Sequence, residues 1–236
     1  MKTQHFTTQD APKVIDLESG TDNLIVEENM TPSPAGKATT VHVQSGSTLL
    51  YSFNAVPQNN LVRSITLEME DGASATFHGI VFGNDSHELR LNLKEIHMHG
   101  ASVGRTVVRS IMAEQSTFHL NGLIDIRHEA NHSDTRLEGR SILLSKEARS
   151  TLIPSLEIAA RDVKASHAAA TGPIDPEQVF YLTSRGMLPE EALALILRGF
   201  LQDVLAQLPN TSATEALMMK WETFLTKLYA TPPSLL

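Results

Sequence analysis

The sequence has 236 residues, 41% hydrophobic and 19% charged, which is typical of a globular protein with one large domain or two small ones. A formal net charge of −8 argues against a general nucleic-acid binder, because nothing compensates for phosphate repulsion. The chain has no cysteine, which excludes a thiolate nucleophile, a persulfide carrier and a cluster bound by its own thiolates. We find no signal-peptide core and no apolar run of membrane-spanning length, and we therefore expect a cytoplasmic protein without membrane contact.

From about residue 13 to 163, apolar and polar side chains alternate in short runs, the period-2 pattern of half-buried β-strands. The pattern is clear at 40–43, 64–70, 88–93, 122–126 and 141–144. Turn signals punctuate these runs at Asp71-Gly72, Gly83-Asn84-Asp85 and Asn121-Gly122. No long helical pattern intervenes, so this part of the chain is predicted to be all-β.

Two similar segments indicate a structural repeat. The segment around Phe77 resembles the one around Phe118, which lies 41 positions later, and Leu120 and Ile142 are 22 positions apart. An interval of roughly 20–25 residues built from short strands is typical of a β-solenoid. The pattern therefore favours a solenoid over a β-sandwich.

After Gly172 the pattern becomes helical. Asp175-Pro176-Glu177-Gln178 predicts a capped helix that ends at Arg185-Gly186, and Pro189 opens a second helix. The apolar side chains of this second helix recur at i, i+3, i+4 and i+7; they are Leu193, Ile196, Leu197, Phe200, Leu201, Val204, Leu205 and Leu208. The segment from Ser212 to Glu215 matches a capping box and predicts the start of a third helix. Its predicted apolar face carries Leu217, Met218, Trp221, Leu225 and Leu228.

Ten histidines invite a metal-site interpretation. His97 and His99 would share one face of a strand, since residues i and i+2 point to the same side. His128-Glu129-Ala130-Asn131-His132 matches the zinc-protease motif H-E-x-x-H, which requires a helix so that both imidazoles face one ion. This motif follows a predicted strand and precedes a turn, so solvated strand-turn histidines are its favoured interpretation. For His97 and His99, polar strand positions are favoured.

An enzyme remains an alternative hypothesis: a β-helix carbohydrate hydrolase or lyase, or a metal hydrolase that uses His128, Glu129 and His132. The chain has one Trp and three Tyr, few for the aromatic platforms that bind sugars. No phosphate-binding loop and no Gly-x-Ser-x-Gly elbow is present.

From Asn121 to Phe200 a series of motifs occurs in order. The blocks with the strongest pattern are Pro154-x-Leu156-Glu157-Ile158, Ser166-His167 and Phe180-Tyr181-Leu182-x-Ser184-Arg185-Gly186. This series resembles the C-terminal half of the SufB and SufD proteins, over roughly 80 residues. Typical members are longer and have an additional N-terminal helical part, so the resemblance implies a shortened member.

The resemblance implies a mainly β fold: a right-handed parallel β-helix followed by a small C-terminal α-helical segment. We expect an N-terminal tail at 1–12, a β-helix domain at 13–171 and a helical domain at 172–236. It also implies a scaffold subunit of iron–sulfur cluster assembly rather than an enzyme. Members dimerise through their β-helices, and their C-terminal helices dock the ATPase SufC.

Within the family the Ser-His block usually begins with Cys, and its His lies at the interface where clusters form. Here Ala165 stands at the Cys position, while Ser166 and His167 are retained. The resemblance therefore favours a SufD-like subunit over a sulfur-accepting SufB-like one. His167 is the candidate ligand of iron or of a transient cluster at a dimer interface, and His128 and His132 are weaker metal candidates.

The expected partners are a SufC-like ATPase and either a SufB-like subunit or a second copy of the chain. No tightly bound cofactor is expected in the isolated chain. A third hypothesis is a degenerate homologue that serves only as an interaction module. The alternative for His167 itself is a hydrogen-bonded turn histidine between the β-helix and the helices.

Overall fold

The computed structural model describes residues 1–30, 36–212 and 214–221. Its elements are β1 (Lys2–Thr7), η1 (Thr8–Asp10), β2 (Val14–Asp16), β3 (Asp22–Asn29), β4 (Lys37–Val43), β5 (Thr48–Ala55), β6 (Leu61–Met69), β7 (Ser74–Gly83), β8 (Glu88–His97), β9 (Val103–Met112), β10 (Thr117–Ile126), β11 (Asp134–Leu143), β12 (Arg149–Ile158), β13 (Lys164–Pro173), α1 (Pro176–Thr183) and α2 (Pro189–Leu205). Residues 214–221 are also helical.

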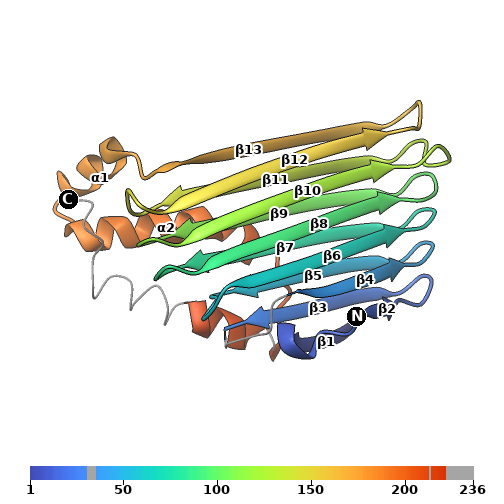
Figure 1. The fold of residues 1–236 in the computed structure, drawn as a ribbon, viewed down its shortest axis with the longest axis horizontal. Coiled ribbons are helices and arrows are strands. Elements are labelled where there is room, and N and C mark those ends of the chain that lie inside the picture. The colour runs from blue at the N-terminus through green and yellow to red at the C-terminus, as the bar shows by residue number, and fades with distance from the viewer. Residues whose placement is uncertain (31–35, 213, 222–236) are drawn as a thin grey trace.

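The strands form a parallel β-solenoid. Odd-numbered strands make a seven-stranded sheet in the order β1-β3-β5-β7-β9-β11-β13, and even-numbered strands make a six-stranded sheet from β2 to β12. Consecutive strands therefore alternate between the two sheets, and each coil stacks on the preceding one (Figure 1). The predicted fold class, a mainly β solenoid followed by a small helical segment, is confirmed. Strand β1 lies within the segment expected to be an N-terminal tail, and the last strand ends at Pro173.

The predicted repeat length is wrong. Ser74 pairs with Val103 and Val103 with Asp134, so these coils advance by 29 and 31 residues rather than 20–25. Phe77 and Phe118 lie in different sheets, on β7 and β10, and are not equivalent positions of successive coils. Both point inward and are fully buried, so their similar surroundings reflect a shared apolar interior.

Asn121-Gly122, expected to be a turn, lies inside β10. A Cβ atom on Gly122 would lie 2.5 Å from Cδ1 of Leu137, which belongs to the opposite sheet. The glycine is therefore explained by the close approach of a side chain across the interior. The other two predicted turns, at 71–72 and 83–85, do connect strands.

One corner of the solenoid is a column of left-handed residues. Gly20, Gly46, Gly72, Ala101 and His132 all have positive φ. The amide of each of these residues donates to a carbonyl of the following coil, as Gly72 does to Gly100 and Ala101 does to Asn131. The same tight turn is thus repeated from coil to coil, with or without a glycine.

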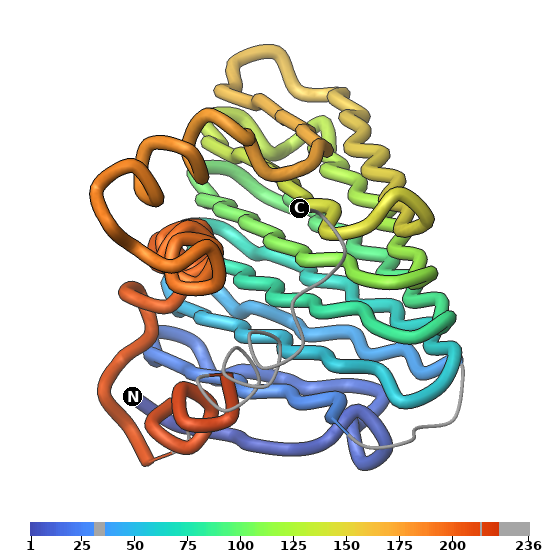
Figure 2. Tube along the Cα trace, turned by 90° about the vertical axis from the view of Figure 1, so that its left-hand side faces the viewer, coloured from blue at the N-terminus to red at the C-terminus, as the bar shows by residue number. Residues whose placement is uncertain are grey.

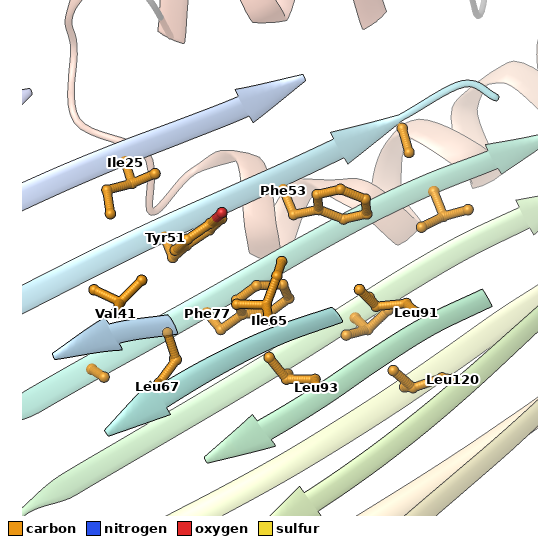
Figure 3. Close-up of a cluster of buried hydrophobic side chains, with 14 of the residues drawn as sticks. Ile25, Val41, Tyr51, Phe53, Ile65, Leu67, Phe77, Leu91, Leu93 and Leu120 are labelled. Atoms are coloured by element: carbon orange, nitrogen blue, oxygen red, sulfur yellow. The ribbon is translucent and has the colours of Figure 1, made fainter. Parts of the chain in front are cut away.

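The interior between the sheets is packed with alternate side chains of the strands, as the period-2 pattern predicts. Figure 3 shows part of this cluster, in which side chains of β5 and β7 meet those of β6 and β8. The labelled residues are Ile25, Val41, Tyr51, Phe53, Ile65, Leu67, Phe77, Leu91, Leu93 and Leu120.

Helix α2 and the helical residues 214–221 pack on the outer face of the seven-stranded sheet (Figure 2). Leu197, Leu201 and Val204 of α2 are buried there with Ile80 and Ile111 of the sheet. Leu217 and Trp221 extend this cluster, and the Trp221 indole donates to Asn54 over 3.3 Å. None of the helices in the described residues is long and apolar enough to cross a membrane.

The first two helices begin where the sequence predicts. Asp175 caps α1 by accepting from the Glu177 amide at 2.9 Å, and Gly186 has a φ of 93°. For the third helix, the predicted cap at Ser212 is wrong. The backbone amides of Thr211 and Thr214 each donate to the other residue's hydroxyl, so Thr211 is the capping residue. Leu225 and Leu228 lie outside the described residues.

Candidate functional site

The open end of the solenoid is formed by β12 and β13. Each is the last strand of its sheet and pairs with one neighbour only, β10 or β11. Nothing stacks on the far side of this coil in the described part of the chain, as Figure 1 shows above β13. The other edge of each strand therefore presents backbone groups that no further strand pairs.

His167 belongs to this last coil. It is in register with Leu137 of β11, which in turn aligns with Thr106 of β9 and Phe77 of β7. Phe77, Thr106 and Leu137 are buried in the interior, because a further coil covers each of them. His167 occupies the same column but is exposed, because it lies on the last coil.

The imidazole of His167 crosses the end of the solenoid and is held by one hydrogen bond. Its Nδ1 lies 3.0 Å from the carbonyl oxygen of Pro154, on β12 of the other sheet. A carbonyl only accepts, so Nδ1 carries the hydrogen and the neutral ring keeps its lone pair on Nε2. An Nδ1–H bound to a backbone carbonyl is the arrangement that orients many metal-ligating histidines.

The weaker candidates His128 and His132 lie in the turn between β10 and β11, the context that the sequence predicts. Their side chains are 74% and 73% exposed. His132 pairs with Asp162 at 2.9 Å, whereas the closest charged partner of His128 is Glu129 at 3.9 Å. The helix required by H-E-x-x-H is not present at this position.

His97 and His99 do not share a strand face, contrary to the prediction. Strand β8 ends at His97, whose side chain is buried inside the solenoid, and His99 lies in the following turn against Glu70 at 2.5 Å. The alternation of side chains stops where the strand stops.

His97 belongs to a buried polar network that the sequence interpretation missed. Its Nε2 lies 3.2 Å from Glu95, and its Nδ1 lies 2.8 Å from Ser102. Glu95 also accepts from the hydroxyls of Thr106 and Thr135, at 3.0 and 2.7 Å. Glu95 and His97 continue the inward set of Leu89, Leu91 and Leu93 on β8, and this shared parity is the signal that could have revealed them.

A second buried network lies nearer the N-terminal end. Arg63 donates to both carboxylate oxygens of Glu27, at 2.7 and 2.8 Å, and both side chains are fully buried. The hydroxyls of Thr8 and Tyr51 also donate to Glu27. Burial raises the pKa of Tyr51 well above its ordinary value, and the Glu27 charge raises it further. This network joins three strands and η1 across the interior.

The junction with the helices exposes apolar surface. Phe180 is 72% exposed and Tyr181 54% exposed, and Leu188 and Leu195 are also exposed. A shallow hollow between α1 and α2 includes Tyr181, Leu182 and Ile196. Arg185 places its guanidinium 4.5 Å from the centre of the Tyr181 ring.

Within the described residues, no group of three or more His, Asp or Glu side chains is placed to hold a metal ion. His167 is therefore a single nitrogen donor at an exposed edge.

Residues 27–200 match the model of the family described as "SUF system FeS cluster assembly, SufBD core domain". The chain belongs to the SufBD family. This match spans the solenoid from β3 onward, together with α1 and most of α2. The description of this family names the SUF system of iron–sulfur cluster assembly.

The relatives of similar sequence have names from the same family. The chain is 35% identical to the iron–sulfur cluster assembly protein SufD of Bacillus subtilis (strain 168) over 139 residues, which cover 59% of the chain and 32% of that protein. It is 36% identical to SufD of Escherichia coli (strain K12) over 104 residues, 44% of the chain and 25% of that protein. It is 23% identical to the SufBD family protein ycf24 of Pyropia yezoensis over 199 residues, 84% of the chain and 39% of that protein. The matched regions thus cover roughly a quarter to two fifths of these relatives.

Proposed function

We propose that the chain is a SufD-like scaffold subunit that joins a second SufBD-type β-helix through its open end and docks a SufC-like ATPase through its helices. The observation that carries this proposal is the combination of family membership with His167 on an unpaired terminal coil. Ala165, at the position that is usually Cys in the family, supports a SufD-like over a SufB-like role. We divide the chain near residue 172 into these two functional units.

The open end is suited to a second β-helix. Strands β12 and β13 present an unpaired edge, and solvent-exposed edges of this kind invite pairing with another chain. On β13, the exposed Ala168, Ala169 and Ala170 are small and uncharged, so a second strand can approach closely. Exposed Ile158 on β12, in register with the buried Ile126, adds apolar area at this open end.

A matched pair of variants on β13 tests this interface. Ala169 lies in the inward column that faces the open end, whereas Ala168 faces the outer surface of the sheet, because neighbouring strand residues alternate. We expect Ala169→Arg to abolish association with a SufB-type subunit or with a second copy, as measured by light scattering. Ala168→Arg, with the same change in charge and size, should retain it. Equal effects of the two variants, or none, would argue against an end-to-end interface.

His167 would contribute one imidazole nitrogen to iron or to a nascent cluster, with the remaining ligands supplied by the partner. This role is supported by its exposure on the last coil and by the Nδ1–H bond to Pro154, which directs the lone pair to Nε2. The iron–sulfur cluster is the cargo of this assembly, held at the interface and passed on.

Two substitutions of His167 separate a ligand from a structural residue. Asn can still donate to the Pro154 carbonyl but offers no ring nitrogen, whereas Ala removes both functions. In the reconstituted complex with SufC and SufB, we expect both variants to associate normally and to lose cluster assembly. An imidazole-nitrogen signal in the pulsed electron paramagnetic resonance spectrum of the wild-type complex should also disappear. Assembly unchanged by His167→Ala would instead favour an interaction module without a direct role at the cluster.

The exposed apolar side chains of the helices would receive the ATPase. Phe180 and Tyr181 lie on α1, which has no buried residue, and Leu188 lies between α1 and α2. The buried face of α2 packs on the sheet, so only the rest of its surface can bind a partner. An exposed apolar surface of this kind, rimmed by polar groups, is typical of a protein interface.

Phe180→Glu tests the docking surface, with Val14→Glu as the control. Val14 is also apolar and 51% exposed, but it lies on β2 at the opposite end of the solenoid. We expect Phe180→Glu to abolish co-purification with SufC and Val14→Glu to preserve it. If the folded Phe180→Glu variant still binds SufC with wild-type affinity, the helical docking site is wrong.

A further inference from the structure

The outer face of the seven-stranded sheet is only partly covered by helices. Side chains from the later halves of the strands, such as Ile80 and Ile111, are buried under α2. The earlier halves of β9, β11 and β13 are not covered, and their outward side chains Arg105, Arg136 and Lys164 reach solvent.

These cations are aligned by the register of the sheet. Arg105 lies opposite Arg136, Arg136 lies opposite Ser166, and Lys164 lies opposite Asp134. Adjacent strands are about 4.8 Å apart, so side chains from neighbouring coils can contact one small ligand. Together these five side chains line a shallow hollow at the start of the three strands.

Charge in the hollow is unbalanced. It contains three cations and one carboxylate, in a chain whose formal net charge is −8. Asp134 is paired with Arg105, whose Nη2 lies 2.9 Å from Oδ1, while Nη1 donates to the carbonyls of Gly104 and Asp134. These bonds fix the Arg105 guanidinium at the wall of the hollow.

The other donors are less constrained. Arg136 contacts Glu138 through Nη2 at 3.0 Å, and Glu138 is also bound by Arg109 and Arg140. Burial raises the pKa of Glu138, but the arginines outweigh this effect and hold it below the ordinary value. Arg136 is thus one of three arginines that bind Glu138. The Lys164 ammonium and the Ser166 hydroxyl have no hydrogen-bond partner within the described residues.

We propose that this hollow binds the phosphate group of a small molecule. The positive charges of two guanidinium groups and an ammonium attract a tetrahedral dianion, and Arg136, Lys164 and Ser166 supply donors to it. Charge-assisted bonds of this kind are the strong ones. The donors come from three successive coils, so the stacking of the solenoid holds them in place. Ser166 faces this hollow while its neighbour His167 faces the open end, so the phosphate site is separate from the proposed cluster interface.

Titration of the full chain with inorganic phosphate, followed by NMR amide shifts, tests the site. We expect saturable shifts centred on residues 103–105, 134–136 and 163–166. Lys164→Gln should weaken binding about tenfold, the effect of removing one charge-assisted hydrogen bond. Asp134→Asn should tighten binding several-fold, because it removes the carboxylate that competes for Arg105. Lys146→Gln, the same charge change in the exposed turn between β11 and β12, should leave the affinity unchanged.

Adenosine 5′-monophosphate and adenosine serve as a second pair of probes. Binding of the nucleotide with the same shifts, and no binding of the nucleoside, would assign recognition to the phosphate group alone. The absence of saturable shifts at millimolar phosphate would overturn the proposal. So would equal weakening by Lys164→Gln and Lys146→Gln, which would indicate unspecific charge attraction.

Discussion

The carboxylate of Glu95 occupies the space that a side chain on Gly104 would need. A Cβ atom at position 104 would lie 1.6 Å from Oε1 of Glu95 and 2.7 Å from the hydroxyl oxygen of Thr135. Glu95 cannot move away freely, because His97, Thr106 and Thr135 all bond to it inside the solenoid. The glycine on one sheet and the buried acid on the other are thus a matched pair.

Gly104→Ala should therefore destabilise the fold strongly. We expect the free energy of unfolding, measured with urea, to fall by about 2–4 kcal/mol, because the carboxylate must shift and leave buried hydroxyls unpaired. Gly172→Ala is the control, since nothing lies within 4 Å of a Cβ there and its φ is not in the left-handed region. Similar stabilities for the two variants would show that the Glu95 network can rearrange at little cost.

The buried pair of Arg63 and Glu27 gives a second prediction. Arg63→Met leaves the Glu27 carboxylate buried without its cation, and loss of one partner of such a pair costs about 3–5 kcal/mol. Adding Glu27→Gln removes the uncompensated charge, so the double variant should be more stable than Arg63→Met alone. Arg90→Met, which breaks the exposed pair with Glu88, should cost less than about 1 kcal/mol.

Local patterns in the sequence predict the elements well and their arrangement less well. Strand alternation and the Asp175 cap are properties of a few neighbouring residues, and both are confirmed. The length of a coil depends on which strands pair, and the similarity of the segments around Phe77 and Phe118 reflects interior packing in two different sheets. Pairing of distant strands leaves no local signal in one sequence.

The sequence pattern missed several residues of the interior for the same reason. A polar residue in an alternating pattern is assigned to solvent, yet Glu95 and His97 point inward. Glu95 is satisfied by Thr135, 40 residues later, and His97 by Ser102, just before the next strand. Gly104 and Gly122 signal their role only when the facing Glu95 and Leu137 are known. His167 was found through a motif, but its exposure follows from its position on the last coil.

His78 makes the stability of the fold depend on pH. It is 1% exposed on β7, where Asp203 and Gln207 of the α2 region and Arg109 of β9 face it. Burial lowers the pKa of His78 from 6.5 to about 4. Between these pH values the unfolded chain binds a proton that the folded chain does not, so stability falls as the pH decreases from 6.5 to 4.

Replacing this histidine should remove its share of the pH dependence. We expect the wild-type chain to lose roughly 2–3 kcal/mol more than His78→Gln between pH 7 and pH 4, with urea unfolding as the measurement. His119→Gln is the control, because this histidine is partly exposed on the outer face of β10. If the wild type and His78→Gln lose stability equally over this range, His78 is already protonated beneath α2 or reaches solvent.

Reciprocal substitutions in the corner column test the cost of its left-handed turns. Gly72 and Ala101 occupy equivalent positions in successive coils, with φ of 63° and 56°, and each donates its amide to the next coil. A left-handed conformation costs a residue with a Cβ about 1–2 kcal/mol, partly offset by the greater freedom of glycine in the unfolded chain. Ala101→Gly should therefore raise the thermal midpoint, and Gly72→Ala, which meets no atom within 4 Å, should lower it by a similar amount. Opposite shifts of comparable size would assign the effect to the backbone, whereas a loss in both variants would mean that the Ala101 methyl group contributes packing of its own.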